Sequence, residues 1–334
     1  MKLRYESLHN HTTASDGAQT YLEVLATAEK VGIGVVAFTD HDALPNEADL
    51  KTLAEYQGPV KWLLGCEVTS GLPRELGGGA ASGMFHILGL WTDPHNAALL
   101  EHCRRAQEAR AERLTQMVTN LTGLGFKITA EDCLKASGGE SVGRPHIVRA
   151  LLAHSENLAV IDGLRLEMEQ AAIADAGVAM DYMNMMQRDP ADYPYRLFLS
   201  EDAFVPGVYV DYLYVIDMDA SVKLIREAGG VAMLAHWPTI MKKIDAGMLE
   251  GFLRDGRLDG VELRTGYYDS QVPGTERTLV AMAERTGAAT TLGVDGHTAE
   301  ALTRFVADRP LAERTVGQTA RLAERFGRKE LTAA

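Results

Sequence analysis

Short apolar runs alternate with amphipathic stretches at the start of the chain. The apolar runs are rich in β-branched or aromatic residues, are bounded by Gly, Pro or Asp, and lie at residues 3–8, 35–39, 60–68 and 85–90. Residues 21–31 and 48–56, between them, have apolar positions at helical spacing. Such runs are typical of buried parallel strands, and their alternation with helices predicts an α/β domain.

The alternation stops in residues 96–218. This region is rich in Ala, Leu, Glu, Arg and Met at helical spacing, and it predicts helices at residues 104–124, 129–136 and 144–153. The Met-rich residues 179–189 are interpreted as a further helix that packs in a small core. We therefore interpret residues 96–218 as a mainly helical insertion.

The strand pattern returns after the insertion. Strands are expected at residues 231–235, 260–263 and 288–294, with helices at residues 221–228 and 275–286. Together with the first four, these strands are enough for a closed or nearly closed parallel barrel. This barrel is expected to comprise residues 1–95 and 219–300, and residues 301–334 form an Arg- and Glu-rich helical tail expected to pack on it.

Composition restricts the class of protein. The chain has 334 residues, with 33 Lys and Arg against 46 Asp and Glu, which gives a formal net charge of −13. This balance argues against a protein that coats long nucleic acid, because such binding needs basic patches that neutralise phosphates. No apolar run reaches the roughly 18 residues of a membrane span and no leader is apparent, so we expect a cytoplasmic protein that does not bind membranes. Three cysteines without paired spacing indicate reduced thiols.

The positions of the histidines suggest a metal site. Six of the ten histidines lie at the ends of expected strands: His9, His11, His41, His86, His236 and His297. Asp16, Glu67 and Asp295 lie in the same segments. Because the carboxyl ends of the strands in a parallel barrel form one rim, these side chains are expected to converge. His86 is the exception, since it begins its expected strand; that strand either runs in the opposite direction or begins earlier.

The spacing and chemistry of these residues favour transition metals. In the pairs His9 with His11 and Asp295 with His297, residues i and i+2 leave an extended strand in the same direction, so both can reach one centre. Imidazole and carboxylate together suit zinc, manganese or iron better than magnesium or calcium. The sequence therefore predicts a site for divalent transition-metal ions.

Several of these segments resemble a known family. The chain carries, in this order, LHNHTTASDG, TDHD, GCEV, His86, AHW and GVDGH. Their order resembles that of the motifs in the polymerase and histidinol phosphatase (PHP) family of metal-dependent phosphoesterases. GRPHIVRALL, at residues 143–152, resembles the insertion of the family branch that acts on nucleotides and other small phosphoesters. The resemblance implies a distorted (β/α)7 barrel, an α/β fold, with the helical insertion as a substrate cap.

The resemblance also implies two to three bound divalent ions of manganese, iron or zinc. His9, His11, Glu67 and Asp295 would hold the first ion. Glu67, His86 and His236 would hold the second, and Asp16, His41 and His297 the third. Two metals about 3.5 to 4 Å apart lower the pKa of a bridging water, and the resulting hydroxide would attack a phosphoester.

Other residues near these motifs are candidates for direct roles. Asp40 and His236 are assigned to catalysis, Asp40 as an acceptor that orients a metal-bound imidazole. Asp42 is a candidate for the same orienting role, and its alternative interpretation is a solvated residue.

Substrate contacts are assigned to Arg144 and His146, where a guanidinium offers a bidentate fork to phosphate, and to Arg264. Many relatives have His-Pro where this chain has His236-Trp237-Pro238, so Trp237 is expected to line the pocket or to stack on a ring. The remaining histidines are expected at the surface: His95, His102 and His154.

Three functions remain open from the sequence. The first is hydrolysis of a small phosphorylated substrate, by a phosphatase acting on a nucleotide or nucleoside bisphosphate or by a cyclic phosphate phosphodiesterase. The second is an exonuclease on short oligonucleotides, provided that the insertion presents its arginines on one face; the acidic net charge weighs against it. The third is a non-catalytic, metal-stabilised module, which the complete set of expected ligands disfavours.

Overall fold

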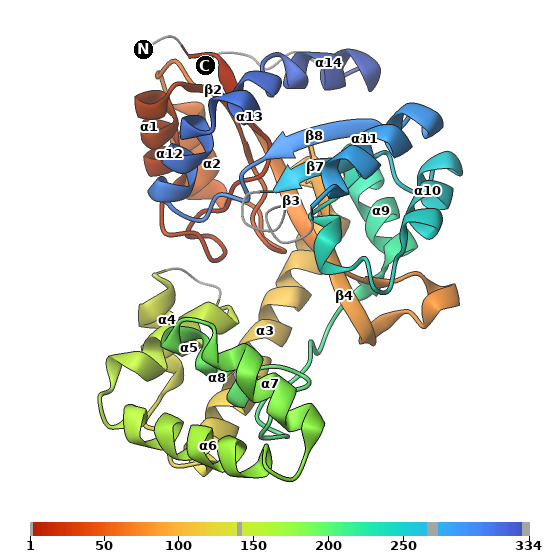
Figure 1. The fold of residues 1–334 in the computed structure, drawn as a ribbon. Coiled ribbons are helices and arrows are strands. Elements are labelled where there is room, and N and C mark those ends of the chain that lie inside the picture. Colours follow the sequence, from red (N-terminus) through yellow and green to blue (C-terminus); the bar gives the residue numbers. More distant parts are fainter. Residues whose placement is uncertain (1–2, 139–141, 266–272, 329–334) are drawn as a thin grey trace. The chain divides into compact units, whose positions relative to one another are not determined.

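The computed structural model describes residues 3–138, 142–265 and 273–328 (Figure 1). The chain divides into two compact units. The first comprises Met1–Gln107 and Tyr214–Ala334, and the second comprises Glu108–Leu213. Each unit has its own hydrophobic core, so each is described separately.

A single mixed sheet forms the centre of the first unit. Its strands among the described residues are β1 (Tyr5–Ser7), β2 (Ile33–Phe38), β3 (Lys61–Leu72), β4 (Gly79–Leu90), β5 (Ile216–Asp217), β6 (Val231–Leu234), β7 (Gly260–Thr265) and β8 (Ala289–Gly293). They pair in the order β1-β2-β3-β4-β6-β7-β8, and the short β5 pairs with β3. The Leu8 amide donates to the Leu292 carbonyl at 3.4 Å, and a parallel bridge joins Asn10 to Gly296. These bonds join the first strand to the last, so the sheet forms the distorted barrel that the sequence predicted.

Strand β4 differs from the expected parallel pattern. It runs antiparallel to both β3 and β6, with His86 opposite Thr69 and Ile87 opposite Leu234. It also begins before the apolar run at residues 85–90, at Gly79. The strand of His86 therefore both runs in the opposite direction and begins earlier than expected, so both explanations offered for the position of His86 hold. The reversed direction brings the middle of β4 beside the carboxyl ends of β3 and β6, so His86 reaches the expected rim.

Helices cover the sheet of the first unit. They are α1 (Tyr21–Val31), α2 (Glu47–Ala54), α9 (Met218–Glu227), α10 (Ala246–Arg254), α11 (Thr275–Thr286), α12 (Ala299–Ala307), α13 (Arg309–Arg314) and α14 (Gln318–Arg325). Helix α1 begins at a capping box, in which the Thr20 side chain and Glu23 each satisfy the backbone amide of the other. The sequence analysis did not predict α10.

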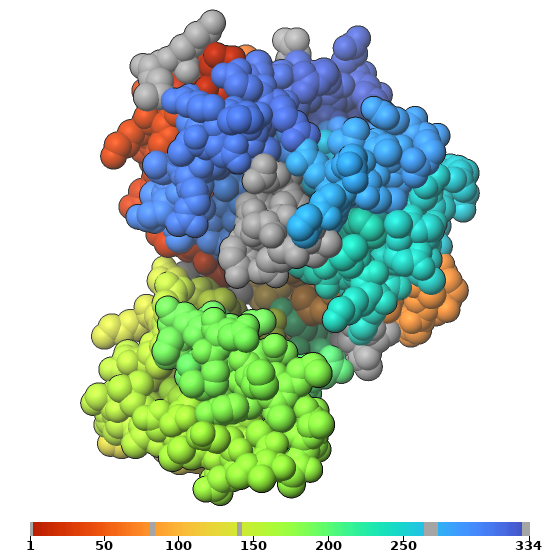
Figure 2. Space-filling view, viewed as in Figure 1, coloured from red at the N-terminus to blue at the C-terminus, as the bar shows by residue number. Residues whose placement is uncertain are grey.

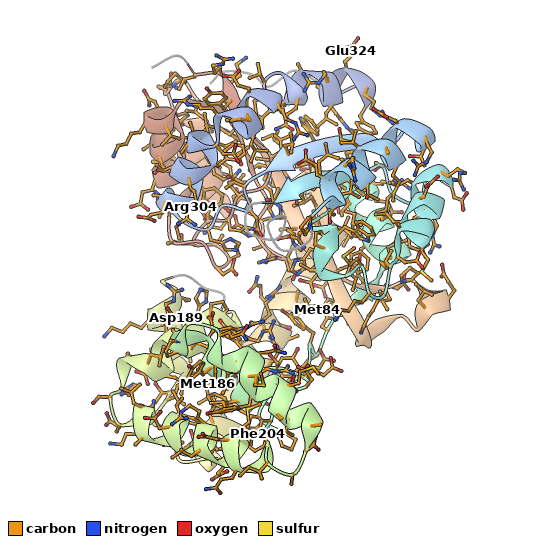
Figure 3. The ribbon with its side chains drawn as sticks, viewed as in Figure 1. Met84, Met186, Asp189, Phe204, Arg304 and Glu324 are labelled. Atoms are coloured by element: carbon orange, nitrogen blue, oxygen red, sulfur yellow. The ribbon has the colours of Figure 1, made fainter. Side chains whose placement is uncertain are left out.

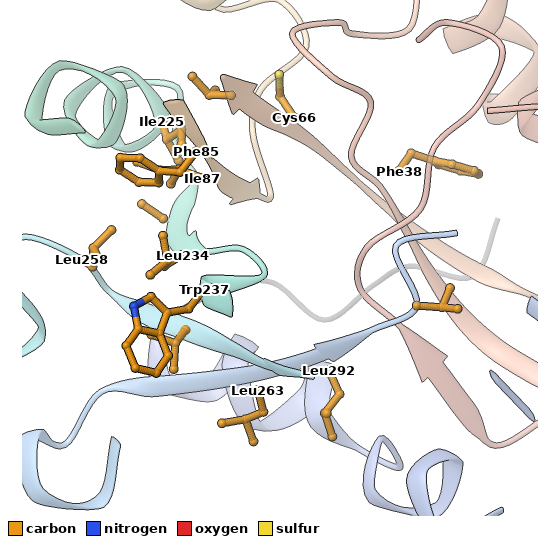
Figure 4. Packing of buried hydrophobic residues seen from close by; sticks show 14 of the residues in the cluster. Phe38, Cys66, Phe85, Ile87, Ile225, Leu234, Trp237, Leu258, Leu263 and Leu292 are labelled. Atoms are coloured by element: carbon orange, nitrogen blue, oxygen red, sulfur yellow. The ribbon is translucent and has the colours of Figure 1, made fainter. Parts of the chain in front are cut away.

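The buried apolar side chains of the first unit form two clusters. Phe38, Phe85, Leu234 and Leu292 belong to the larger cluster (Figure 4). The smaller cluster contains Leu8, Ala37, Leu63, Leu88, Val231 and Met233, and Leu322 of α14 packs with them.

The last helices cover one face of the first unit in the space-filling view (Figure 2). Arg304 of α12 and Glu324 of α14 are exposed and point outward (Figure 3). These two charged residues of the tail thus lie in solvent, while Leu322 packs its last helix against the core.

The secondary structure elements in the described part of the second unit are all helices. Its elements are the long α3 (Ala97–Gly123), which starts in the first unit, α4 (Ala130–Ser137), α5 (Arg144–Ala153), α6 (Asn157–Ala171), α7 (Ala176–Met186) and α8 (Tyr193–Leu197). Its core includes Met117, Leu121, Leu151, Leu197 and Phe198, all fully buried. The helix predicted at residues 144–153 coincides with α5. In the Met-rich helix α7, Met185 is buried, whereas Met180 and Met183 are exposed.

The cysteines are free and buried, as the sequence predicted. Cys66 of β3 shares a hydrogen bond with Cys103 of α3, and this bond together with burial raises the pKa of Cys66. Burial also raises the pKa of Cys133 to about 12. The thiols of Cys66 and Cys133 therefore remain protonated at neutral pH. Among the described helices, none combines the length and hydropathy needed to cross a bilayer.

Candidate metal centre

Glu67 lies at the centre of the imidazole cluster. It stands within β3, is fully buried, and its carboxylate faces five imidazoles. Its Oε2 atom lies 2.9 Å from His41 Nδ1, 3.2 Å from His11 Nε2 and 3.3 Å from His9 Nε2. Its Oε1 atom lies 2.9 Å from His236 Nε2 and 3.2 Å from His86 Nδ1.

Two further carboxylates border the same cluster. Asp295 Oδ1 lies 3.1 Å from His11 Nε2 and 3.4 Å from His9 Nε2. Asp16 Oδ1 lies 3.1 Å from His297 Nε2. All nine residues that the sequence assigned as metal ligands therefore lie in one cluster of the first unit: His9, His11, Asp16, His41, Glu67, His86, His236, Asp295 and His297.

The donor atoms fall into three groups that could each hold a cation. One contains His9, His11, Glu67 and Asp295, the set implied for the first ion. Another contains His11, Asp16, His41 and His297, which adds His11 to the set implied for the third ion. The third group contains His41, Glu67 and His86. In the set implied for the second ion, His236 takes the place of His41.

Several donor atoms of the cluster are buried and make no hydrogen bond. They are His9 Nε2, His11 Nε2, His41 Nδ1 and Glu67 Oε2. Buried polar atoms are nearly always satisfied, so atoms without partners that point at a common centre fit an ion that the protein binds. Imidazole and carboxylate donors suit divalent transition metals.

Charge coupling within the cluster shifts its pKa values. Burial disfavours the charged form of His11, but the Asp295 and Glu67 carboxylates outweigh burial and raise the pKa of His11 to about 10. Burial likewise disfavours the charged form of Glu67, yet the neighbouring imidazoles hold the pKa of Glu67 well below its usual range. At neutral pH the free site thus keeps a proton on His11, and a cation must displace it.

Glu262 is a functional residue that the sequence analysis missed. This carboxylate of β7 is 2% exposed, and its two oxygens lie 3.1 and 3.2 Å from His9 Nδ1. Its Oε2 atom also accepts from the His236 amide at 3.3 Å. A carboxylate behind a ligating histidine fixes the ring orientation and leaves the other nitrogen free for a metal. A charged residue inside an apolar strand was the available signal, because such residues are rarely buried without a partner.

Gly293 makes the approach of β8 to His9 possible. A Cβ atom at this position would lie 2.5 Å from the His9 Cβ and 2.9 Å from Glu262 Oε1. Both distances are too short for any side chain. Glycine therefore lets β8 pass directly beside the His9 and Glu262 pair.

The backbone of the site is strained. Four non-glycine residues in the described part of the chain have positive φ, and three of them belong to this region: Asp42, His236 and Asp295. Such conformations persist only where surrounding contacts enforce them, and they concentrate at functional sites.

Asp40 lies behind His11. Its carboxylate accepts hydrogen bonds from the Thr12 amide at 2.7 Å and from the Ser15 hydroxyl at 2.6 Å. Ser15 Oγ in turn lies 3.4 Å from His11 Nδ1. Asp40 therefore supports His11 through Ser15, and its described hydrogen bonds are with Thr12, Ser15 and Tyr21 rather than with His41.

Asp42 and His102 correct two predictions. Asp42 is 1% exposed and binds the amide and hydroxyl of Thr69, so its interpretation as a solvated residue is wrong. His102 is 4% exposed, so its expected surface position is wrong as well. His95 is exposed and His154 is half-buried. The tight turn after His41 removes Asp42 from solvent, and no pattern around residue 102 marks that histidine as buried.

Trp237 belongs to the hydrophobic core, which corrects its expected place in the pocket. It is 2% exposed, and its Nε1 donates to the Ile244 carbonyl at 2.7 Å (Figure 4). The backbone turns sharply at His236. The His236 side chain therefore faces the ligand cluster, while the next side chain, Trp237, faces the hydrophobic core.

Replacing Trp237 with alanine should therefore lower stability while leaving metal content unchanged. Loss of a buried tryptophan costs about 3 to 5 kcal/mol. Thermal unfolding and elemental analysis of the variant check this expectation. Trp237→Phe serves as the milder variant, since it keeps a buried aromatic ring but removes the hydrogen bond to Ile244 and part of the buried volume. Loss of metal without loss of stability would contradict the core assignment.

The predicted substrate contacts are not part of the described cluster. Arg144 and His146 lie in the second unit, and the side chain of Arg264 is not among those described. Arg144 begins α5, donates to the Leu199 carbonyl at 3.3 Å, and lies 5.7 Å from the ring centroid of Tyr209. His146 is buried, and its Nδ1 accepts from the Gly143 amide at 3.0 Å. Arg264 lies in β7, but its side chain is outside the described residues. These contacts stay predictions.

Comparison with known proteins accounts for the cluster. Residues 7–163 match the profile of the family described as PHP domain. The match confirms the resemblance to the PHP family. The matched segment carries the first six members of the ligand cluster, from His9 to His86, and the other three members follow the insertion.

The relatives that this chain resembles differ in their reactions. The chain is 27% identical over 230 residues to a 3',5'-nucleoside bisphosphate phosphatase of Chromobacterium violaceum, a match that spans 69% of the chain and only 65% of that relative. It is 25% identical over 233 residues to a phosphoribosyl 1,2-cyclic phosphate 1,2-diphosphodiesterase of Eggerthella lenta, covering 69% of the chain and 73% of the relative. It is also 25% identical over 239 residues to a 5'-3' exoribonuclease of Haemophilus influenzae, covering 71% and 69%.

A solved structure supports the fold. A candidate metal-dependent phosphoesterase from Bifidobacterium adolescentis aligns with a TM-score of 0.62 and 25% identity, over 87% of each chain.

Proposed function

We propose that this chain is a metal-dependent phosphoesterase that hydrolyses a small phosphorylated substrate. The substrate is a nucleotide or nucleoside bisphosphate, or a cyclic phosphate. One observation carries the proposal: nine imidazole and carboxylate side chains converge on one rim, with buried nitrogen and oxygen atoms that have no hydrogen-bond partner. The names of the bisphosphate phosphatase and cyclic phosphodiesterase relatives support the substrate class.

The cluster suits two to three divalent ions of manganese, iron or zinc. When bound, such ions lower the pKa of water and polarise phosphoryl oxygens. Residues around the cluster hold the histidine ligands in the orientation that this chemistry requires. Glu262 orients His9, and Ser15 links Asp40 to His11. In this proposal Asp40 acts through His11, whereas His236 lies in the cluster itself, beside Glu67 and His86.

A phosphate-release screen tests the proposal. Protein loaded separately with manganese, iron or zinc is incubated with mononucleotides, 3',5'-bisphosphates, cyclic phosphates and short oligonucleotides. Turnover of at least one small phosphoester, lost on chelation, is expected. Absence of turnover with every metal, in protein shown to contain metal, would favour the non-catalytic module.

An exonuclease is the second candidate, and the exoribonuclease relative favours it. The net charge of −13 weighs against long nucleic acid. The two activities differ in salt dependence, because an enzyme that contacts many phosphates loses affinity steeply as salt rises. Preference for longer oligonucleotides together with a steep salt slope would select the exonuclease.

Arg144 remains the proposed contact to a substrate phosphate. A charge-assisted hydrogen bond is worth roughly 1.5 to 3 kcal/mol, so Arg144→Ala should lower kcat/KM by about one to two orders of magnitude. Metal content should not change. Arg144→Lys should recover only part of the loss, since an ammonium cannot reproduce the bidentate fork. Steady-state kinetics on the best small substrate measure both variants, and an unaffected Arg144→Ala enzyme would remove the contact.

A further inference from the structure

The turn that carries His41 is held by β3 on one side. The Asp42 amide donates to the Glu67 carbonyl at 3.0 Å, and the Glu67 amide donates to the Asp40 carbonyl at 3.1 Å. The Asp42 carboxylate accepts from the Thr69 amide at 2.8 Å and from the Thr69 hydroxyl at 2.6 Å. These bonds fix the turn relative to the strand that bears Glu67.

Helix α3 holds the same turn from the other side. His102 Nε2 lies 3.3 Å from Asp42 Oδ1. Gln107 Nε2 donates to the Asp42 carbonyl at 3.1 Å and to the His41 carbonyl at 3.4 Å. Both contacts lie within the first unit, because α3 belongs to it as far as Gln107.

The hydrogen-bond directions at His102 form a consistent chain. An ionised carboxylate can only accept, so His102 donates to Asp42 through Nε2. Its Nδ1 is then the acceptor for the Tyr214 hydroxyl, which lies 3.2 Å away. His102 is 4% exposed, so neither bond is readily replaced by water.

The position of His41 matters to more than one cation. His41 is a member of two of the three donor groups, one with Asp16 and one with Glu67. The residue that follows it, Asp42, has a φ of 44°, a conformation that needs support from its surroundings. A site of this kind tolerates displacements of only about half an ångström.

We propose that His102, assisted by Gln107, is a positioning residue that holds His41 between two cation sites. It acts through Asp42 and does not contact the cluster itself. The effect on hydrolysis rests on the proposed function, whereas the effect on cation binding does not.

Titration with Co²⁺, followed by its visible absorption, tests the proposal. His102→Leu keeps an apolar side chain of similar size and removes the donor. It should weaken at least one Co²⁺ site by about 10- to 100-fold and change the spectrum of that site, as loss of an outer hydrogen bond to a metal site does. On the best phosphoester, kcat should fall by a similar factor and KM should stay unchanged. His102→Gln, whose Nε2 can replace the donor, should recover most of both.

Two further variants separate positioning from general damage to the helix. Cys103→Ala alters the adjacent buried residue of α3, whose thiol bonds to Cys66 of β3 rather than to the turn, so this variant should bind Co²⁺ as the wild type does. Gln107→Leu tests the second contact if His102→Leu does not fold. The proposal is overturned if folded His102→Leu matches the wild type, if Gln107→Leu matches it where His102→Leu does not fold, or if Cys103→Ala weakens Co²⁺ binding equally. A wild type that binds Co²⁺ but hydrolyses no phosphoester would refute the proposed function alone.

Discussion

Replacement of Glu67 by glutamine should abolish phosphoester hydrolysis and strip the cluster of most of its metal. One carboxylate faces five imidazoles in this site, at 2.9 to 3.3 Å. Glutamine keeps the size of the side chain and removes its charge. The donor group of His41, Glu67 and His86 thus loses its only carboxylate, and the group that contains Asp295 loses one of its two. Metal ions contribute several kcal/mol to stabilising the transition state, so the rate should fall by at least about three orders of magnitude.

Glu6→Gln is the matched control for Glu67→Gln. Glu6 is also a buried carboxylate, in β1, but it accepts from the Gly317 and Thr319 amides before and within α14. Its replacement should lower the melting temperature without changing metal content. Elemental analysis, thermal unfolding and kinetics of the two variants measure the contrast. Near wild-type turnover in Glu67→Gln would show that this carboxylate does not hold the catalytic ions.

Removal of metal should abolish activity and lower stability together. A ligand present at a thousandfold excess over its Kd stabilises the folded state by about 4 kcal/mol, and each bound ion contributes in this way. The chelated protein should therefore unfold at a distinctly lower temperature than protein reloaded with manganese, iron or zinc. Without metal, His236 Nε2 keeps its hydrogen bond to Glu67 and His9 Nδ1 keeps its hydrogen bond to Glu262, so the fold should persist.

Calorimetry before and after reloading measures this effect. Glu67→Gln provides the control, because its melting temperature should respond little to added metal. Less than one ion per chain after reloading, or full activity after exhaustive chelation, would contradict a metal-dependent mechanism.

The ligand cluster could be predicted from the sequence because its members lie at the ends of strands. His9, His41 and Asp295 each follow an apolar run, and parallel strands bring their carboxyl ends together. The direction of β4 could not be predicted, since an apolar run has no direction. Its first half, from Gly79 to Met84, is rich in Gly and Ala and gives no strand signal.

The supporting residues were harder to find than the ligands. Trp237 follows a ligand directly, and only the fold shows that its ring turns into the core. His102 lies in a charged helical segment, where a histidine normally faces solvent, and its burial depends on tertiary contacts with Asp42 and Tyr214. Such partners are distant in the chain, so no local pattern encodes them.

The division of the barrel by the second unit has a consequence for biosynthesis. Strand β4 pairs with β6, which follows it in the chain only after the whole insertion. His236, Asp295 and His297 also follow the insertion, so they are the last of the nine ligands to leave the ribosome. Non-local pairing of this kind slows folding, and chains fold as their segments emerge. A nascent chain thus exposes six ligands without the three that complete the cluster. We expect it to bind cations only weakly until translation passes His297, so that the metal taken up is the one available to the finished protein.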